Sequence, residues 1–305
     1  MATFDSNSRA SGHDRMAGVV YRAARAEDLP EMVDLFLTAA SEMCVRNNVA
    51  FALPPRQAML AGYEHVRTTG IFRVAAAESR IISIAGAVIR DDLWYLSAFW
   101  ALPEFQRKRI GMPLLRQVFE AGVKAGARKF STWSSVDITA MAAYMKLGML
   151  PGYEILMFEG SPQRLPAAEP GCELAPLDKR EAMELDHTMR GARREVDHDL
   201  WAKQMLQGRQ VLVKGNVVGY YYVKKGMVGP VAWRESGDAE VLLSLACRDA
   251  AAMAPSIRLA IPGVNHSALR FSFESGLRLT SFAHLLTTAS FGRLEQYLPS
   301  GPSLF

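Results

Sequence analysis

Two stretches of this chain repeat each other at a fixed displacement, and this repeat constrains the fold more than any other feature of the sequence. Residues 137–148 place Ala140, Tyr144 and Gly148 four apart, on one face of an expected helix. Residues 265–276 place alanine, serine and glycine at the matching positions, 128 residues later. Repeats on this scale indicate duplicated structural units. We therefore expect two tandem copies of one fold.

A strand, a basic loop and a helix precede the first of these stretches. Residues 93–102 are an apolar run, residues 106–111 are polar, and apolar residues at helical spacing follow from Met112. A helix N-terminus carries unpaired N–H groups and partial positive charge, which favour a phosphate or pyrophosphate. The loop adds the charges of Arg107, Lys108 and Arg109. This order predicts an anion site at the start of the helix.

Together the two motifs resemble the GNAT superfamily of acetyl-CoA-dependent N-acetyltransferases. The family's loop pattern, Arg/Gln-x-x-Gly-x-Gly/Ala, is met at Gln106 and Gly111, but Arg109 replaces the middle glycine. The later pattern, Asn-x-x-Ala-x-x-x-Tyr-x-Lys-x-Gly, is met at four positions, with aspartate in place of asparagine. These positions are Ala140, Tyr144, Lys146 and Gly148, after Asp137. A glycine at position 109 would permit positive φ and a close backbone approach, so the arginine either changes how coenzyme A is held or prevents its binding.

The resemblance implies an α/β fold class: two tandem GNAT-like mixed-sheet domains with flanking helices. It implies acetyl-CoA as acyl donor, a primary amine of a small molecule as acceptor, and direct attack without a metal. Tyr144 would be the general acid that protonates the leaving thiolate, and a backbone N–H of residues 99–102 would hold the oxyanion. The implied coenzyme-binding residues are Phe99, Trp100, Ala101, Leu102, Gln106, Arg107, Lys108, Arg109, Ile110, Gly111, Met112, Asp137 and Ala140. The implied substrate-binding residues are His65, Arg90 and Ser97.

The second copy differs from the first where chemistry would be done. Ser272 stands where Tyr144 stands, so the phenol is missing. Residues 234–239 match the loop pattern formally, but Glu235 and Asp238 place negative charge beside the expected anion site. We therefore assign the coenzyme to the first copy and expect the second to complete the substrate cleft. A coenzyme site in the second copy remains the alternative.

The repeat and the Pro/Gly-rich segments define the expected domains. We expect a disordered tail at 1–18, a first GNAT domain at 19–158, a linker at 159–171, a degenerate second domain at 172–293 and a tail at 294–305. Expected helices lie at 28–43, 57–68, from 112, around 140–148 and at 179–194. Expected strands lie at 19–24, 71–77, 81–90, 93–102, 130–134, 153–158, 211–214, 217–224, 227–233 and 257–261.

Composition narrows the partners. The 305 residues carry a formal net charge of +4 without a lysine- or arginine-rich run, so we expect no nucleic-acid partner. No segment approaches the ~20 apolar residues of a membrane span. Cys44, Cys172 and Cys247 lack disulfide or metal spacing, which favours a reduced, cytoplasmic setting. We expect a monomer or a homodimer.

Several of these residues also have a structural interpretation. Asp137 is expected to cap its helix, and Tyr144 could simply pack against the sheet. Trp94, Tyr95, Phe99 and Trp100 are expected in the core, Ser97 as a buried strand hydroxyl, and Cys44 as a small core residue. His187, Asp197 and His198 are expected at a solvated helix end rather than at a metal.

The general base is not evident. Residues 93–102 contain no acid or histidine; Asp91 and Asp92 precede them and Glu104 follows. A water chain, a residue of the second copy, or an already neutral amine would each serve. The rival hypothesis is a non-catalytic, GNAT-derived sensor that binds an acyl-CoA or an amine.

Overall fold

The computed structural model describes residues 18–49, 53–167 and 171–305, and the chain divides into two compact units. The first unit contains Met1–Gly86 and Ala98–Ala121, and the second contains Ala87–Ser97 and Gly122–Phe305. The expected tail at 1–18 lies outside the described residues except for Gly18. The bounds of the two compact units differ from those of the expected copies at 19–158 and 172–293. The expected domain bounds describe the sequence repeat and stay a prediction.

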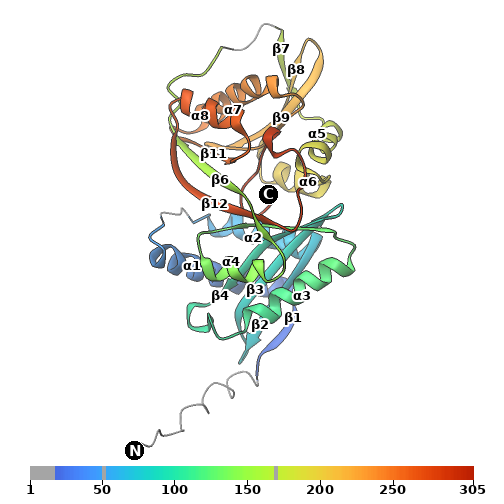
Figure 1. Ribbon diagram of the computed structural model, residues 1–305, viewed down its shortest axis with the longest axis vertical. Helices are drawn as coiled ribbons and strands as arrows, with labels where there is room; N and C mark the ends of the chain where they lie inside the picture. The colour runs from blue at the N-terminus through green and yellow to red at the C-terminus, as the bar shows by residue number, and fades with distance from the viewer. Residues whose placement is uncertain (1–17, 50–52, 168–170) are drawn as a thin grey trace, which may run out of the picture. The chain divides into compact units, whose positions relative to one another are not determined.

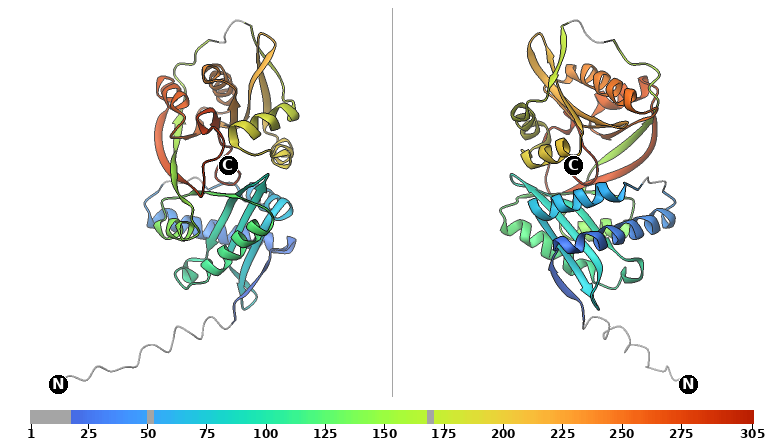
Figure 2. Two further views of the ribbon diagram at one scale, coloured as in Figure 1. Left: turned by 45° about the vertical axis from the view of Figure 1, so that its right-hand side comes forward. Right: turned by 180° about the vertical axis from the view of Figure 1, so that it is seen from behind.

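The first unit is a sheet with helices on both of its faces. Figure 2 shows α1 and α2 on one face and α3 on the other. Its elements are β1 (Val20–Ala23), α1 (Leu29–Arg46), α2 (Arg56–Thr69), β2 (Gly70–Ala77) and α3 (Gly111–Lys124), with parts of β3 (Arg80–Arg90) and β4 (Leu93–Ala101). Apolar residues at helical spacing bury one stripe of α1, including Met32, Phe36 and Ala39. The expected strands at 71–77 and 81–90 and the expected helix at 57–68 are confirmed within two residues.

The second unit contains the remaining elements around a larger sheet (Figure 1). Its helices are α4 (Ile138–Met145), α5 (Lys179–Leu185), the π-helical turn Asp186–Arg190, α6 (Glu195–Lys203), α7 (Ala239–Met253) and α8 (His266–Glu274). Its strands are β5 (Lys129–Ser134), β6 (Leu150–Gly160), β7 (Cys172–Pro176), β8 (Gln207–Val213), β9 (Asn216–Lys224), β10 (Met227–Trp233), β11 (Ile257–Pro262), β12 (Arg278–Thr287) and β13 (Tyr297–Leu298).

The repeat found in the sequence has a structural counterpart. The helices α4 and α8 begin at Ile138 and His266, and the strands β5 and β11 begin at Lys129 and Ile257. Both pairs keep the displacement of 128 residues. The helix that opens at Gly111 likewise has its counterpart in α7. The tandem α/β prediction is confirmed.

The two copies exchange their last strands. By the repeat, β6 ends the first copy and β12 ends the second. Yet β12 pairs antiparallel with β5, from His284 opposite Ser134 to Thr287 opposite Ser131, and β6 pairs antiparallel with β11. The strands β6 and β12 also pair with each other. Each copy therefore completes the sheet of the other, and residues 159 and 160, expected in a linker, are the end of a paired strand.

The sheet is mixed, as expected for this fold class. Parallel pairs join β4 to β5 and β10 to β11, whereas the other pairs given with their register are antiparallel. The pairing of β4 with β5 covers Leu93–Leu96. In the second copy β10 bends at a bulge after Val228, and β13 then pairs with it, Ala232 opposite Tyr297.

The segment 294–305, expected to be a tail, is packed into the second unit. Tyr297, Leu298 and Phe305 are completely buried. The sequence of this proline-containing segment gave no sign of its burial, because the residues that bury it lie far away in the chain. The tail prediction is corrected by this packing.

The contact between Gly122 of α3 and the ring of Trp94 predicts a large cost for any added side chain. A Cβ at Gly122 would lie 2.4 Å from Cδ1 of the completely buried Trp94. We expect Gly122→Ala to lower the free energy of unfolding by about 1–3 kcal/mol, measured by urea denaturation. The control is Gly62→Ala in α2, where a Cβ meets nothing within 4 Å; it should be stabilising by up to about 1 kcal/mol. Equal effects of the two changes would contradict this packing.

Candidate functional site

The loop 106–111 lies in the first unit and adopts the backbone that a glycine would favour. Arg107 and Arg109 have φ of 60° and 61°, in the left-handed region. Holding a non-glycine residue there costs on the order of 1 kcal/mol. The side chain of Arg109 is exposed and does not fill the loop. The arginine therefore preserves the bend at the position where the family pattern has glycine.

The charges of this loop are unpaired. Arg107, Lys108 and Arg109 are exposed, and in the described part of the chain none of them forms an ion pair. Lys108 lies over the ring of Phe105, 5.1 Å from its centroid. At Gly111, where α3 begins, a Cβ would lie 3.0 Å from the ring of Phe99. The loop thus places positive charge and the N–H groups of a helix start together, without an internal anion to neutralise them.

The backbone at the end of β4 is partly used by the protein itself. Ser83 Oγ donates to the Trp100 carbonyl at 2.8 Å, and Gln106 Nε2 donates to the Ala101 carbonyl at 3.2 Å. The Leu102 N–H donates to the Ile82 carbonyl at 3.0 Å. Because the Leu102 N–H already has an acceptor, the oxyanion donors expected among residues 99–102 are reduced to the N–H groups of residues 99–101. Farther along, Ile110 is buried and its carbonyl accepts from the hydroxyl of Tyr21, while Met112 is half-buried in the first turn of α3.

Tyr144 belongs to the second unit and is buried at the end of α4. Its side chain is 6% exposed. Burial, and then the negative charge of Asp137, raise the pKa of the phenol well above its usual value. The hydroxyl therefore keeps its proton throughout the neutral range, which a proton donor requires.

Asp137 caps α4, as the sequence predicted. Its carboxylate accepts from the N–H groups of Thr139 at 2.8 Å and Ala140 at 3.2 Å. These contacts satisfy donors at the helix start that have no partner within the helix. The half-buried Ala140 lies one turn before Tyr144 on the same helix face.

The three substrate-binding candidates lie in different settings. His65 is buried in α2 of the first unit. Arg90, in the second unit, is 6% exposed and forms a two-pronged ion pair with Asp197, at 3.0 and 2.5 Å. Ser97 is half-buried rather than buried, and its hydroxyl donates to the Ser303 carbonyl at 2.7 Å. Trp94 and Tyr95 are core residues as expected, whereas Phe99, Trp100 and Cys44 are half-buried.

A buried polar cluster around Asp186 was not foreseen. The carboxylate of this completely buried residue accepts from Arg194 at 2.7 and 2.9 Å and from the Tyr220 hydroxyl at 2.5 Å. His198 lies between Asp186, at 2.8 Å, and the Tyr222 hydroxyl, at 2.9 Å. Burial alone would raise the pKa of Asp186, but the charge of Arg194 and the contact with His198 lower it to about 2.

This cluster corrects the prediction of a solvated helix end. His198 and Asp197 are each 1% exposed, and only His187 is at the surface, with its Nδ1 3.6 Å from Asp91. No group of three metal-ligating side chains occurs among the described residues. The sequence could not show that the polar face of α6 meets the tyrosines of β9. One available signal was the alternation of Tyr220 and Tyr222 on one face of that strand.

The carboxylates near β4 are all engaged. Asp91 accepts from the backbone N–H of Arg193 at 2.8 Å, Asp92 pairs with Lys129 at 3.3 Å, and Glu104 pairs with Arg80 at 3.1 Å. Each of these three carboxylates already has a hydrogen-bond or ion-pair partner, whereas a general base needs a carboxylate that can accept a proton from the amine. The base thus remains unassigned among the residues near this strand.

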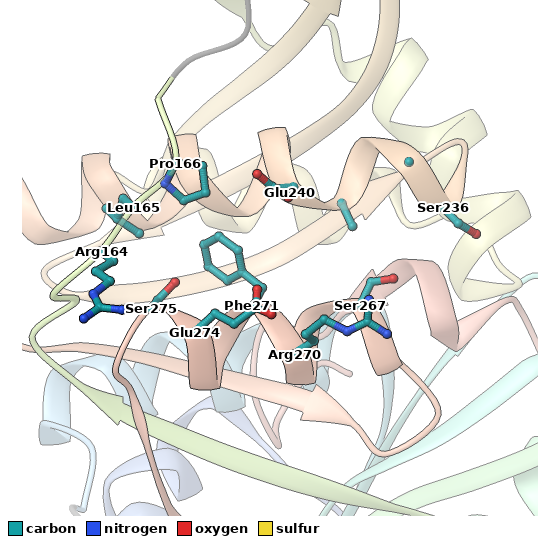
Figure 3. Close-up of a pocket in the computed structure, with 12 residues that line it drawn as sticks. Arg164, Leu165, Pro166, Ser236, Glu240, Ser267, Arg270, Phe271, Glu274 and Ser275 are labelled. Carbon is teal, nitrogen blue, oxygen red and sulfur yellow. The ribbon is translucent and has the colours of Figure 1, made fainter.

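The second copy has a pocket of about 600 Å³ beside the N-terminus of α7. Figure 3 shows Ser267 and Arg270 of α8 on the side of Ser236, with Arg164 beside Ser275 at the other end. Glu240 and Glu274 also line it and oppose the two arginines. Arg234, which matches the family pattern, is not among the residues that line this pocket. Its guanidinium donates to Glu181 at 3.0 Å and to the Val217 carbonyl at 2.8 Å. The charge of this pocket is thus balanced, unlike that of loop 106–111.

Comparisons with known proteins agree with this architecture. Residues 38–149 match the family model described as Acetyltransferase (GNAT) family. No curated protein matches the chain by sequence. A proposed acetyltransferase from Pyrococcus horikoshii has a TM-score of 0.77 at 17% identity, covering 95% of this chain and 96% of its own.

Two further solved structures are similar over most of the chain. A GCN5-related N-acetyltransferase from Sphaerobacter thermophilus has a TM-score of 0.63 at 14% identity, covering 88% of this chain and 95% of its own. A tandem GNAT protein from the clavulanic acid biosynthesis pathway has a TM-score of 0.61 at 12% identity, covering 88% and 98%. Residues 38–149 thus match the GNAT family. The chain carries two GNAT-like copies in tandem, a fold similar to that of these solved structures.

The Asp186 cluster yields a stability prediction. Asp186→Asn would leave the buried charge of Arg194 without its counter-charge, so we expect a loss of about 3–5 kcal/mol of unfolding free energy at pH 7. The control is Glu181→Gln, at an exposed pair, which should cost about 0–1 kcal/mol.

The stability that the Asp186 carboxylate contributes should decrease at low pH. Because the folded-state pKa of Asp186 is lowered from 3.8 to about 2, its contribution is fully present above pH 3.8 and is lost as the pH falls through 2. The difference between wild type and Asp186→Asn, followed by denaturant unfolding, should therefore shrink over that interval. A difference that stays constant down to pH 2 would refute the assignment.

Proposed function

We propose that the chain is an N-acetyltransferase that transfers the acetyl group of acetyl-CoA to a primary amine of a small molecule. The observation that carries this proposal is the bent loop 106–111, whose three positive side chains are exposed at the start of α3 and form no ion pair with the residues that the structure describes. A diphosphate is the ligand that such a loop favours. The residues that would hold the coenzyme are the end of β4, this loop, and the start of α4.

In this proposal the first copy does the chemistry. The amine attacks the thioester carbonyl and gives up one proton, to water or to a residue of the second copy, while a main-chain N–H among residues 99–101 stabilises the oxyanion. The tetrahedral intermediate collapses, and Tyr144 donates its proton to the leaving thiolate. His65, Arg90 and Ser97 remain the proposed substrate-binding residues. Since Arg90 is already paired with Asp197, it would act by orienting its neighbours unless that pair opens.

Two observations support the first copy over the second as the coenzyme site. Ser272 replaces the phenol, and its hydroxyl donates to the Ala268 carbonyl within its own helix. In addition, β13 pairs with β10 at Val231 and Ala232. The edge of β10 is thus occupied by the chain itself and is closed to a ligand that pairs with main-chain groups.

The proposed setting is the reduced cytoplasm, because the three cysteines in the sequence lack the spacing of a disulfide framework or a metal site. Among the described residues, no helix has the length and apolar character needed to cross a bilayer. The absence of a nucleic-acid partner and the monomeric or dimeric state stay predictions.

A sensor that binds without catalysis is the second candidate. The observation that favours it is the engagement of Asp91, Asp92 and Glu104, which leaves no evident base near β4. Thiol release and coenzyme binding, measured together, distinguish the two functions.

Tyr144→Phe tests the enzyme directly. The change removes the proton donor while keeping the ring, so we expect turnover to fall about 10²- to 10⁴-fold with little change in coenzyme binding. The measurement is free thiol release from acetyl-CoA across a panel of amines. The matched control is Tyr153→Phe in the neighbouring strand β6, which should retain activity. Coenzyme binding by the wild type without turnover on any amine would establish the sensor instead.

Paired glycine substitutions test which copy binds the coenzyme. Gly111→Glu places a negative, crowded side chain at the start of α3, so we expect acetyl-CoA affinity to fall about tenfold or more. Gly237→Glu, where a Cβ would meet nothing within 4 Å, should leave binding unchanged. Calorimetric titration of both folded variants measures this. Loss of binding only in Gly237→Glu would move the site to the second copy.

A further inference from the structure

The pocket between α7 and α8 lies outside the residues assigned to acetyl transfer, and its walls are held in place by the second unit. Residues 164–166, which the sequence predicted to be part of a linker, form one of these walls. The Gln163 N–H donates to the Ser275 carbonyl at 2.8 Å, and Arg248 Nη2 donates to the Pro166 carbonyl at 2.7 Å. Because the segment is anchored at both ends, the pocket is already formed before a ligand enters, which favours binding.

Charged side chains of both signs line this pocket without neutralising one another. They are Arg164, Arg270, Glu240 and Glu274. All four are exposed, and in the part of the chain that the structure describes none of them forms an ion pair. Elsewhere in the second unit an exposed arginine and glutamate do pair, as Arg193 and Glu184 do at 3.1 Å. The charged groups of the pocket are therefore available to a ligand.

The charges alternate along the pocket, as Figure 3 shows. Arg164 lies at one end and Arg270 at the other, with the two glutamates between them. Ser236 and Ser267 lie at the end of Arg270, where α7 begins. Hydroxyls and the N–H groups of a helix start also favour an anion. The end at Arg270 therefore has the stronger preference for a carboxylate, and the middle of the pocket favours a cation.

Apolar side chains complete the lining. The ring of Phe271 points from α8 into the pocket, and Leu165 and Pro166 of the linker segment add further apolar surface. Pockets of roughly 300–1,000 Å³ hold organic ligands of moderate size. At about 600 Å³ this pocket lies within that range, so a molecule larger than a single amino acid can enter it.

The sequence repeat shows that the carboxylates belong to the second copy alone. At the positions 128 residues earlier, the first copy has Met112 where the second has Glu240, and Lys146 where the second has Glu274. The negative charge of the two glutamates disfavours a diphosphate. The pocket therefore favours a ligand that carries a positive group as well as a negative one.

We propose that this pocket binds a zwitterionic dipeptide with an apolar side chain. The ammonium group donates to the carboxylates of Glu240 and Glu274, and the terminal carboxylate accepts from the guanidinium of Arg270. The apolar side chain packs on Phe271 and Leu165. The two charges of a dipeptide are several bonds apart, as the unlike charges of the pocket are, whereas those of a free amino acid share one carbon atom. This site is independent of the proposed acetyl transfer.

The test uses leucylalanine as the probe, titrated calorimetrically into the full-length protein without acetyl-CoA. We expect binding at millimolar concentration or below. N-acetyl-leucylalanine lacks the ammonium group and leucylalanine amide lacks the carboxylate, so each should bind about tenfold or more weakly. Failure of leucylalanine to bind at millimolar concentration, or equal binding of either analogue, would overturn the proposal.

A matched pair of arginine substitutions distinguishes this pocket from the amine site of the proposed transferase. Arg270→Gln removes the cation that holds the carboxylate, so leucylalanine affinity should fall about tenfold to a hundredfold. Arg278→Gln in β12 changes an exposed arginine that does not line the pocket, and should keep the affinity within about twofold. Unchanged affinity in Arg270→Gln, or an equal loss in both variants, would mean that the dipeptide binds elsewhere, and the pocket would be rejected.

The two glutamates are tested by the selectivity of the pocket. In the double variant Glu240→Gln with Glu274→Gln, N-acetyl-leucylalanine should bind as well as leucylalanine, because no carboxylate remains to prefer the ammonium group. Both glutamates are exposed, so we expect this variant to keep the Tm of the wild type. A folded double variant that still prefers leucylalanine would count against the site. None of these measurements uses acetyl-CoA, so failure of the enzyme hypothesis would leave their outcome unchanged.

Discussion

The pairing of β12 with β5 on one side and with β6 on the other is the constraint on which the second unit depends. It places the last strand of each copy next to a strand of the other. Both copies then rely on hydrogen bonds that their own sequence cannot supply. Separation of the copies would expose the edges of β5 and β11, which is unfavourable for buried strands. The strands of the two copies therefore depend on each other for their pairing.

The second copy keeps a continuous apolar core but differs from the first copy at the positions that match the family pattern. Its apolar core is continuous, with Trp233, Leu242 and Ile261 completely buried. The features that a coenzyme would need are changed: Ser272 has no phenol, Arg234 is held by Glu181, and β13 occupies the edge of β10.

Around Asp186 the same unit buries charges that small domains usually keep in solvent. The ion pairs of Asp186 with Arg194 and of Asp197 with Arg90 are neutral and hydrogen-bonded, so their burial is compensated. Arg190 is buried beside these pairs, and its Nε donates to the oxygen of Phe305.

The sequence by itself determined the α/β class, the tandem repeat, most of the strands and helices, and the cap of α4 by Asp137. These follow from local patterns, because periodicity and capping depend on residues near each other in the chain. The positive φ of Arg109 was also foreseeable, since the family pattern has glycine there. The strand exchange, the burial of residues 294–305 and the cluster around Asp186 were decided only by the tertiary structure. Each depends on partners about a hundred or more residues away, or on which face of an element meets another, and no local pattern encodes such contacts.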